Sequence, residues 1–408
     1  MEIIRQAELS LREIFAGFED IAYENQAKVL KAFQKQRIRE YHFNPSTGYG
    51  YGDMGRDTLE DIYADIFAAE DALVRSQLVS GTHAISACLF GLLRTGDRLL
   101  SITGSPYDTL ASIIGRDKKN RGTLVERGIT YEEIALKEMG EPDMQAISQA
   151  ISEDITMVLI QRSRGYNLRP SLDVDEIAAL IKLAKEKSPD TIVMVDNCYG
   201  EFTDYREPSQ CGADITAGSL IKNPGGGLAP SGGYIVGKRD LVEQVAFHIT
   251  APGLGKKLGA SLLNNRLLYQ GLFLAPHVVL QALKGAALLA HVFEQLGYRA
   301  FPKWNEKRGD IVQAIQLNDS QEVLNFCQII QSSSPVDCDV RLEYAELPGY
   351  DDEIVMAAGT FVQGSSIEMS CDAPLREPYC AFIQGGLTYE HCRYVAMNLL
   401  ESFALKSK

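Results

Sequence analysis

The sequence predicts an α/β protein with a large, mostly parallel sheet, helices on both faces of that sheet, and a smaller α+β domain after it. Two observations predict this fold class. Between residues 72 and 238, short apolar runs of strand-forming residues alternate with helical segments, which is typical of buried parallel sheets. The chain has 408 residues, more than one small core needs, and this length favours two domains.

The N-terminal part precedes the alternating region. Apolar residues such as Leu9, Ile14 and Phe18 recur at roughly helical spacing, so helices are expected over 3–36. The stretch YHFNPSTGYGYGDMGRDTLE, with glycine at 48, 50, 52 and 55, then predicts a loop, and a helix is expected over 57–70.

The alternating region gives the elements of the sheet. Strands are expected over 72–80, 97–103, 155–163, 191–197, 213–220 and 232–238, and helices over 82–93, 107–115 and 171–187. A helix over 276–297 links to strands and helices expected in 311–317, 322–331, 352–359, 366–371 and 389–405. The predicted organisation is a helical segment (1–44), a large α/β domain (45–270), and a linker helix with a small α+β domain (271–408).

Charge and composition exclude several classes of protein. The net charge of −14 argues against a nucleic-acid partner. The N-terminus has no apolar signal region, and no apolar run is expected to cross a bilayer, so we expect a cytoplasmic protein without a membrane partner. The eight cysteines show no CxxC and the six histidines no HExxH, which favours reduced thiols and no metal site.

Two strand ends carry candidate ligand-binding groups. In VSGTHAISA a strand ends and a helix begins at Gly81 and Thr82, where free N–H groups and the helix dipole suit a phosphate. In TIVMVDN an apolar strand ends at Asp196, at the sheet edge where open parallel sheets bind ligands. Taken alone, each pattern is more typical of a plain junction or of a turn.

Lys222 lies in the segment SLIKNPGGG, between an apolar run and three glycines. Most lysines are solvated surface residues. A lysine in a dry pocket has its ammonium form disfavoured and becomes an amine nucleophile, and glycines behind it would leave room for a planar ligand. The order Gly81, Asp196, Lys222 is more informative than any one of them.

This order resembles that of the fold-type-I pyridoxal-phosphate enzymes, in particular the cystathionine/methionine γ-lyase family and its aluminium-resistance branch. The matching segments are RDTLE…AAEDALVRSQLVSGTHAI, GDRLLSITGSPYDTL, VMVDNCYGEF, GADITAGSLIKNPGGG and GGYIVG, which together span residues 45–240. The resemblance implies the pyridoxal-phosphate transferase fold and a role for several residues.

By this resemblance, Lys222 would carry pyridoxal 5′-phosphate as a Schiff base and act as general base, and Asp196 would pair with the ring nitrogen. Tyr107 would stack on the ring and assist catalysis. Gly81, Thr82 and Ser219 would bind the phosphate.

The sequence departs from the family pattern in several places. Ile221 replaces the usual threonine before the lysine. In the family, a second subunit donates a clamp for the phosphate, and this sequence has no clean match to it. Tyr51 is the first candidate to replace the clamp, with Tyr49 and Arg56 as alternatives. The ring-hydroxyl partner would be Arg162, Ser163 or Arg164.

Two further residues are candidates for the site. Arg376, in APLREPY, would bind the substrate carboxylate, because guanidinium binds carboxylates in bidentate fashion, or it is a surface arginine. His83 would line the cofactor or cap the start of a helix.

The resemblance implies a carbon–sulfur lyase acting on a small sulfur-containing amino acid by β- or γ-elimination. The alternatives are an aminotransferase or decarboxylase on the same fold, or a cofactor-binding stress-response protein without turnover. A homodimer or homotetramer with shared active sites is also implied.

Overall fold

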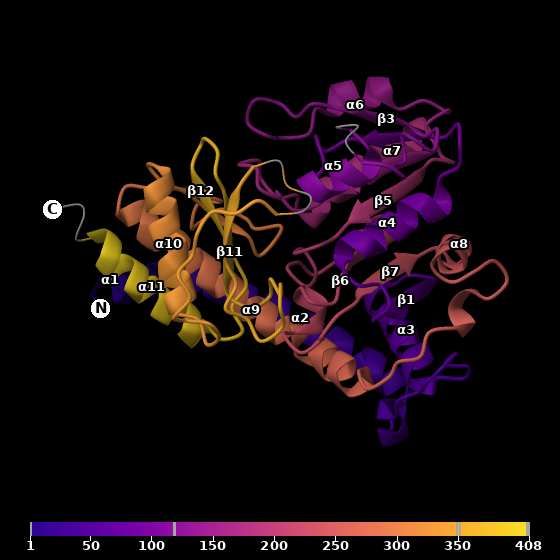
Figure 1. Ribbon diagram of the computed structural model, residues 1–408, viewed down its shortest axis with the longest axis horizontal. Helices are drawn as coiled ribbons and strands as arrows, with labels where there is room; N and C mark the ends of the chain where they lie inside the picture. Colours follow the sequence, from indigo (N-terminus) through magenta and orange to yellow (C-terminus); the bar gives the residue numbers. More distant parts are fainter. Residues whose placement is uncertain (1, 117–119, 348–349, 351, 405–408) are drawn as a thin grey trace.

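The large domain is built on a seven-stranded sheet with the order β1-β7-β6-β5-β4-β2-β3 (Figure 1). The computed structural model describes residues 2–116, 120–347, 350 and 352–404. Strand β7 is antiparallel to both of its neighbours, and the other pairs are parallel. The strands are β1 (Asp71–Arg75), β2 (Arg98–Ser101), β3 (Thr130–Glu133), β4 (Met157–Gln161), β5 (Ile192–Asp196), β6 (Ile215–Ser219) and β7 (Gly233–Gly237).

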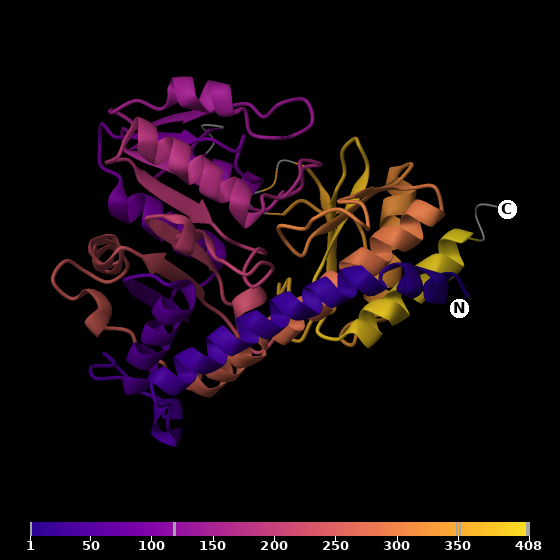
Figure 2. The same ribbon diagram turned by 180° about the vertical axis from the view of Figure 1, so that it is seen from behind.

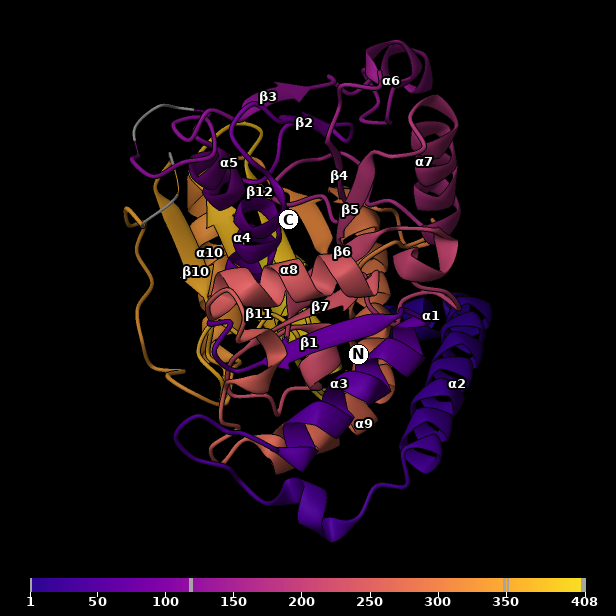
Figure 3. The same cartoon turned by 90° about the vertical axis from the view of Figure 1, so that its right-hand side faces the viewer.

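Helices cover both faces of this sheet. Met194 of β5 packs in the core formed with α4 (Gly81–Leu92), α5 (Asp108–Ile114) and α8 (Arg239–Ile249), whereas its neighbours Val193 and Val195 pack with α6 (Met144–Ala150) and α7 (Val174–Lys187). Helix α3 (Met54–Phe67) covers the β1–β7 part of that second face. Figure 3 shows α4 and α8 in front of the strands. Burial on both faces explains the uninterrupted apolar runs of β4 and β5.

The small domain is an antiparallel five-stranded sheet with the order β10-β11-β12-β9-β8, packed against α10 (Ser320–Ser332) and α11 (Tyr389–Ala404). Its strands are β8 (Arg299–Phe301), β9 (Gln313–Gln316), β10 (Ile354–Ala357), β11 (Ser370–Pro374) and β12 (Cys380–Gln384). Short 3₁₀ helices occur at η1 (Glu40–Phe43), η2 (Pro208–Cys211), η3 (Asn223–Gly225) and η4 (Gly255–Lys257).

Two long helices, α2 (Arg12–Lys35) and α9 (Asn265–Gln295), lie side by side and run along both domains (Figure 2). Helix α9 begins in the large-domain core at Leu268 and ends in the small-domain core at Phe293. Helix α1 (Glu2–Ser10) packs into the small-domain core through Ile4 and Ala7. The N-terminal helices therefore stabilise both halves of the molecule.

Helix α9 corrects one expectation from the sequence. By length and composition it could cross a membrane, with a mean hydropathy of 1.6, although no apolar run was expected to be that long. However, 72% of its most apolar window is buried inside the protein. The composition of α9 is therefore that of a core helix.

Several element boundaries also differ from those predicted. Helix α9 begins at Asn265 rather than at 276, and Pro276 lies inside it. Helix α3 begins at Met54, within the predicted loop, because the Asp53 carboxylate accepts a hydrogen bond from the Arg56 N–H at 2.9 Å and caps the helix. The sequence did not predict β3, β8, β12, α6 and α8.

Candidate active site

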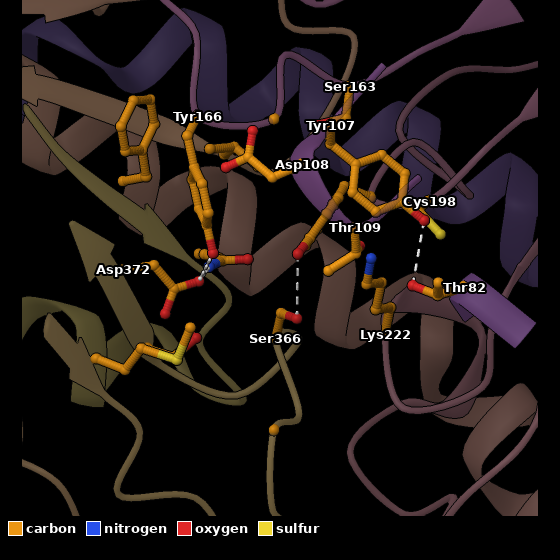
Figure 4. Close-up of a pocket in the computed structure, with 18 of the residues that line it drawn as sticks. Thr82, Tyr107, Asp108, Thr109, Ser163, Tyr166, Cys198, Lys222, Ser366 and Asp372 are labelled. Carbon is orange, nitrogen blue, oxygen red and sulfur yellow. Dashed lines mark hydrogen bonds between the residues drawn. The ribbon is translucent and has the colours of Figure 1, made fainter. Parts of the chain in front are cut away.

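One cavity of about 340 Å³ opens where β4, β5 and β6 end, and the small domain closes its other side. The carboxyl ends of parallel strands meet at one sheet edge, so side chains distant in sequence converge there. Of the predicted site residues, Lys222, Asp196, Tyr107, Thr82 and Arg376 line this cavity. Figure 4 shows the part around Lys222, Tyr107 and Thr82.

Lys222 follows β6, and its Nζ lies 3.8 Å from the centroid of the Tyr199 ring. Burial lowers the pKa of this amine, but Cys198, Tyr199 and Asp196 raise it more, so the pKa lies well above its ordinary value. The expectation that the pocket disfavours the ammonium form was therefore wrong for the chain alone. Burial also raises the pKa of Cys198 and of Tyr199, so Asp196 is the group among these three that supplies negative charge to Lys222.

The glycines after Lys222 pack against protein rather than leaving space for a ligand. A Cβ on Gly226, whose φ is +54°, would lie 2.3 Å from the carbonyl oxygen of Gly271 in α9. A Cβ on Gly271 would in turn lie 2.2 Å from the carbonyl oxygen of Gly225. The glycine run thus seats the Lys222 loop directly on the backbone of α9.

Asp196 is the last residue of β5 and is 3% exposed. Burial raises the pKa of its carboxyl, and the nearby charge of Lys222 opposes that shift. Its Oδ1 accepts a hydrogen bond from the Cys198 backbone N–H at 3.1 Å. Asp196 can thus supply a buried negative charge to a cationic ligand at the sheet edge.

The N-terminus of α4 faces the same region. Ser80 caps it by accepting a hydrogen bond from the His83 N–H at 3.0 Å, and the first intrahelical bond runs from Ala84 N to Ser80 O. The N–H groups of Gly81 and Thr82 precede that bond and point out of the helix end. His83 accepts a hydrogen bond from Val79 N at 3.2 Å and lies outside the cavity lining, as expected for the capping alternative.

Gly81 allows α4 to approach β6 closely. A Cβ on Gly81 would lie 2.9 Å from Cβ of Ser219, the buried last residue of β6. Neither residue lines the cavity, whereas the adjacent Thr82 does, so the contact between Gly81 and Ser219 is a packing contact next to the cavity wall.

Tyr107 precedes α5, and its ring lies against the cavity. Its hydroxyl lies 3.1 Å from Oγ1 of Thr82, and its backbone N–H donates to Oε1 of Gln161 at 3.0 Å. Burial and the carboxylate of Asp196 raise the pKa of this phenol, so it is neutral. Tyr107 and Thr82 thus connect the two helix ends across the cavity.

Other predicted residues lie elsewhere. Tyr51 is 62% exposed and Tyr49 is 70% exposed. Neither side chain lines the cavity of its own chain. Arg56 is buried and donates to the carbonyl oxygens of Gly50 (2.8 Å) and Gly259 (2.9 Å), so its guanidinium is already used to hold these loops.

The three candidates for the partner of the ring hydroxyl lie in different places. Ser163 lines the cavity, and its Oγ donates to Asp310 at 2.8 Å. Arg162 and Arg164 are buried outside the cavity lining, and Arg162 binds Asn197 at 2.7 Å.

Arg376 lies at the cavity wall, on the loop between β11 and β12. Its Nη1 lies 2.9 Å from Oδ2 of Asp352, and its Nη2 donates to the Tyr166 carbonyl at 3.3 Å. About a third of the side chain is exposed. Arg376 can therefore reach a ligand only while sharing its charge with Asp352.

Several cavity residues were not predicted from the sequence: Gln161, Tyr166, Tyr199, Ser366 and Asp372. Gln161 is the last residue of β4, and Tyr199 comes shortly after the end of β5. This position at strand ends was the signal that could have identified them. Asp372 lies within β11 of the small domain, and only the packing of the two domains brings it to the site.

The family model for methionine gamma-lyase matches residues 1–404. The chain belongs to this family. It is 48% identical to "Uncharacterized protein YnbB" of Bacillus subtilis (strain 168), over 99% of this chain and 97% of that protein. It is 26% identical to the L-methionine gamma-lyase of Pseudomonas putida, over 53% of this chain and 48% of that enzyme.

Solved structures show the same fold along the whole chain. A carbon-sulfur lyase involved in aluminum resistance from Clostridium novyi NT superposes with a TM-score of 0.93 at 47% identity, covering 98% of this chain and 94% of that one. The methionine gamma lyase CalE6 from Micromonospora echinospora gives a TM-score of 0.59 at 19% identity, covering 90% of each chain. The predicted pyridoxal-phosphate transferase fold is confirmed.

Proposed function

We propose that this protein is a pyridoxal-phosphate-dependent carbon–sulfur lyase that acts on a sulfur-containing amino acid. The observation that carries the proposal is that Lys222, Asp196, Tyr107 and the N-terminus of α4 surround one cavity at the carboxyl edge of the sheet. An amine, a buried carboxylate, an aromatic ring and free N–H groups are the groups that a pyridoxal phosphate needs.

The residues present fit this cofactor. Lys222 would hold it through its amine, Asp196 would face its ring nitrogen and Tyr107 would lie over the ring. The N-terminus of α4 at Gly81 and Thr82, with Ser219 packed beside it, would take the phosphate. When bound, pyridoxal phosphate supplies an electron sink for the charge left at the substrate Cα.

The chain's own groups would move the protons. Lys222 would take the proton from the substrate Cα, and the neutral phenol of Tyr107 would donate toward the departing sulfur. Arg376 is the candidate for the substrate carboxylate. Loss of the thiol and addition of water give a 2-oxo acid and ammonia, so atoms and electrons balance without an external oxidant.

A product assay tests this function. Given cystathionine or methionine and no keto acid, the loaded protein should release thiol, ammonia and 2-oxo acid over many turnovers. Turnover that stops after one cofactor equivalent and resumes when a keto acid is added would contradict the lyase and support an aminotransferase.

We also propose a cytoplasmic homodimer or homotetramer without a membrane or nucleic-acid partner. Two loops joined by backbone hydrogen bonds, including Gly259 N to Tyr49 O at 3.0 Å, expose Tyr49, Tyr51, Leu262 and Leu263. Met54, the first residue of α3, is exposed as well. Large exposed apolar side chains on adjoining loops are typical of an interaction surface. A second copy would cover them and bring Tyr51 to its site.

A further inference from the structure

The cavity continues beyond Lys222 to a wall formed by Tyr166, Asp372 and Gln384. Asp372 lies on β11, Gln384 ends β12, and Tyr166 lies on the loop after β4. Figure 4 shows Asp372 and Tyr166 on the opposite side of the cavity from Thr82 and Cys198. A ligand attached near Lys222 would direct its side chain toward this wall.

Asp372 is held by two donors on a single oxygen. The Tyr166 hydroxyl donates to Oδ2 at 3.0 Å, and Nε2 of Gln384 donates to the same atom. Among the hydrogen bonds of the described residues, none goes to Oδ1. The side chain is partly exposed and lines the cavity, so Oδ1 is available to a ligand.

None of the ion pairs formed by the described residues includes Asp372, and its cross-strand neighbours on β10 and β12 are the apolar Met356 and Phe382. Burial raises the pKa of its carboxyl to about 6, against the opposing effects of Tyr166, Gln384 and Lys222. Asp372 is therefore a carboxylate at neutral pH. A carboxylate in such a place is costly unless a cation pairs with it.

A second unpaired acceptor lies beside it. Gln384 is 3% exposed, and its Oε1 has no hydrogen-bond partner among the described residues. Its Nε2 donates one of its two hydrogens to Asp372, which fixes the amide orientation and leaves Oε1 free as an acceptor. The wall therefore presents acceptors and negative charge, a surface complementary to a primary ammonium group.

We propose that Asp372, positioned by Tyr166 and Gln384, is a specificity residue that binds an ammonium group on the substrate's side chain. This inference rests on the proposed function, and it names the substrate class: thioether amino acids whose departing thiol carries an amino group, in preference to purely apolar thioethers such as methionine. The α-amino group is excluded as the partner, because it would be taken up by the cofactor held at Lys222.

Binding of two matched, unreactive amino acids tests the proposal. L-Lysine and L-2-aminoheptanoate have side chains of equal length, with a terminal ammonium and a methyl group respectively. Neither contains sulfur, so the result does not depend on whether the protein is a lyase. Calorimetry on the protein loaded with pyridoxal phosphate gives both dissociation constants.

We expect wild type to bind lysine more tightly than aminoheptanoate, and Asp372→Asn to weaken lysine binding by roughly 10- to 100-fold with little change for aminoheptanoate. Asp339→Asn, which changes an exposed carboxylate of the small domain, should change neither constant. Should Asp372→Asn not fold, Tyr166→Phe should weaken lysine binding several-fold by removing one of the two donors to Asp372.

Equal affinity of wild type for both amino acids, or equal losses for both in Asp372→Asn, would overturn the proposal and leave Asp372 a structural residue. If lysine binding depends on Asp372 but no thioether is cleaved, the recognition site stands and the lyase function fails.

Discussion

Lys222 is the residue on which the proposed chemistry depends. Its amine lies over the Tyr199 ring and among acidic groups that favour the ammonium form. A Schiff base forms from the free amine, so the covalent attachment of pyridoxal phosphate to Lys222 should become less favourable as the pH falls.

The link can be located by reduction. Borohydride should bleach the yellow protein loaded with pyridoxal phosphate and fix the cofactor on one peptide, which contains Lys222, as read by mass spectrometry. Lys222→Ala should lose the covalent mass but retain weak binding, whereas Lys182→Ala, on the exposed face of α7, should behave as wild type. Label on a different lysine would contradict the assignment.

Asp196→Asn should keep the fold and lose activity. The amide still accepts from the Cys198 N–H and has no buried charge to desolvate, so the melting temperature should not fall. The negative charge opposite the ring nitrogen is gone, and turnover should drop by on the order of 10²-fold. Steady-state rates and thermal unfolding check both parts, and unchanged turnover would make Asp196 structural only.

The ends of elements bring the large-domain half of the site together. This half of the site was predictable from the sequence, because parallel strands place their ends at one edge of the sheet. It comprises Lys222, Asp196, Gln161 and the N-terminus of α4. The wall around Asp372 was not predictable from the sequence. An element was expected over 366–371, but Glu368 accepts from the N–H groups of Phe361 and Val362 and holds a turn, so β11 begins only at Ser370.

Gly81→Ala tests the contact between α4 and β6. The added Cβ would lie 2.9 Å from Ser219, so the helix end must shift, at a cost of roughly 1–3 kcal/mol. We expect a lower melting temperature and weaker cofactor binding, measured by calorimetry and equilibrium dialysis. Gly17→Ala is the matched control, because nothing lies within 4 Å of its Cβ on helix α2, and it should stabilise slightly.

The central strands enclose a second buried carboxyl that the proposed mechanism does not use. Tyr234 of β7 donates to Oε1 of Glu201 at 2.8 Å, and Oε2 is buried without a partner among the described residues. Burial raises the pKa of Glu201 to about 8 from an ordinary 4.5. The folded state thus binds this proton more tightly than the unfolded chain does.

The contribution of Glu201 to the free energy of unfolding is therefore fully present below its ordinary pKa of 4.5. It is lost as the pH rises through about 8. Glu201→Gln should remove this loss, so the melting temperature of the variant relative to wild type should rise between about pH 5 and about pH 9. The exposed Glu243→Gln serves as control. A difference independent of pH would show that Glu201 does not titrate in this range.

At the scale of the whole molecule, the proposed assembly makes a prediction about mixing. If Tyr51 completes the site of a second subunit, Lys222→Ala and Tyr51→Ala proteins should each be inactive alone. A mixed dimer would contain one intact site, so random exchange should restore about a quarter of wild-type activity. No recovery after exchange, with dimers confirmed by light scattering, would place Tyr51 outside the site.

The path of the N-terminal helices has a consequence for synthesis. Ile4, Ala7 and Leu11 are buried against α9 and the small domain, next to residues of α11 such as Phe403. Figure 2 shows α1 beside α11 at the small domain. On the ribosome these first residues emerge roughly 20–80 s before the last helix is made. Until then the apolar face of α1 cannot be fully buried. Helix α1 therefore reaches its final position only after α11 has been synthesised.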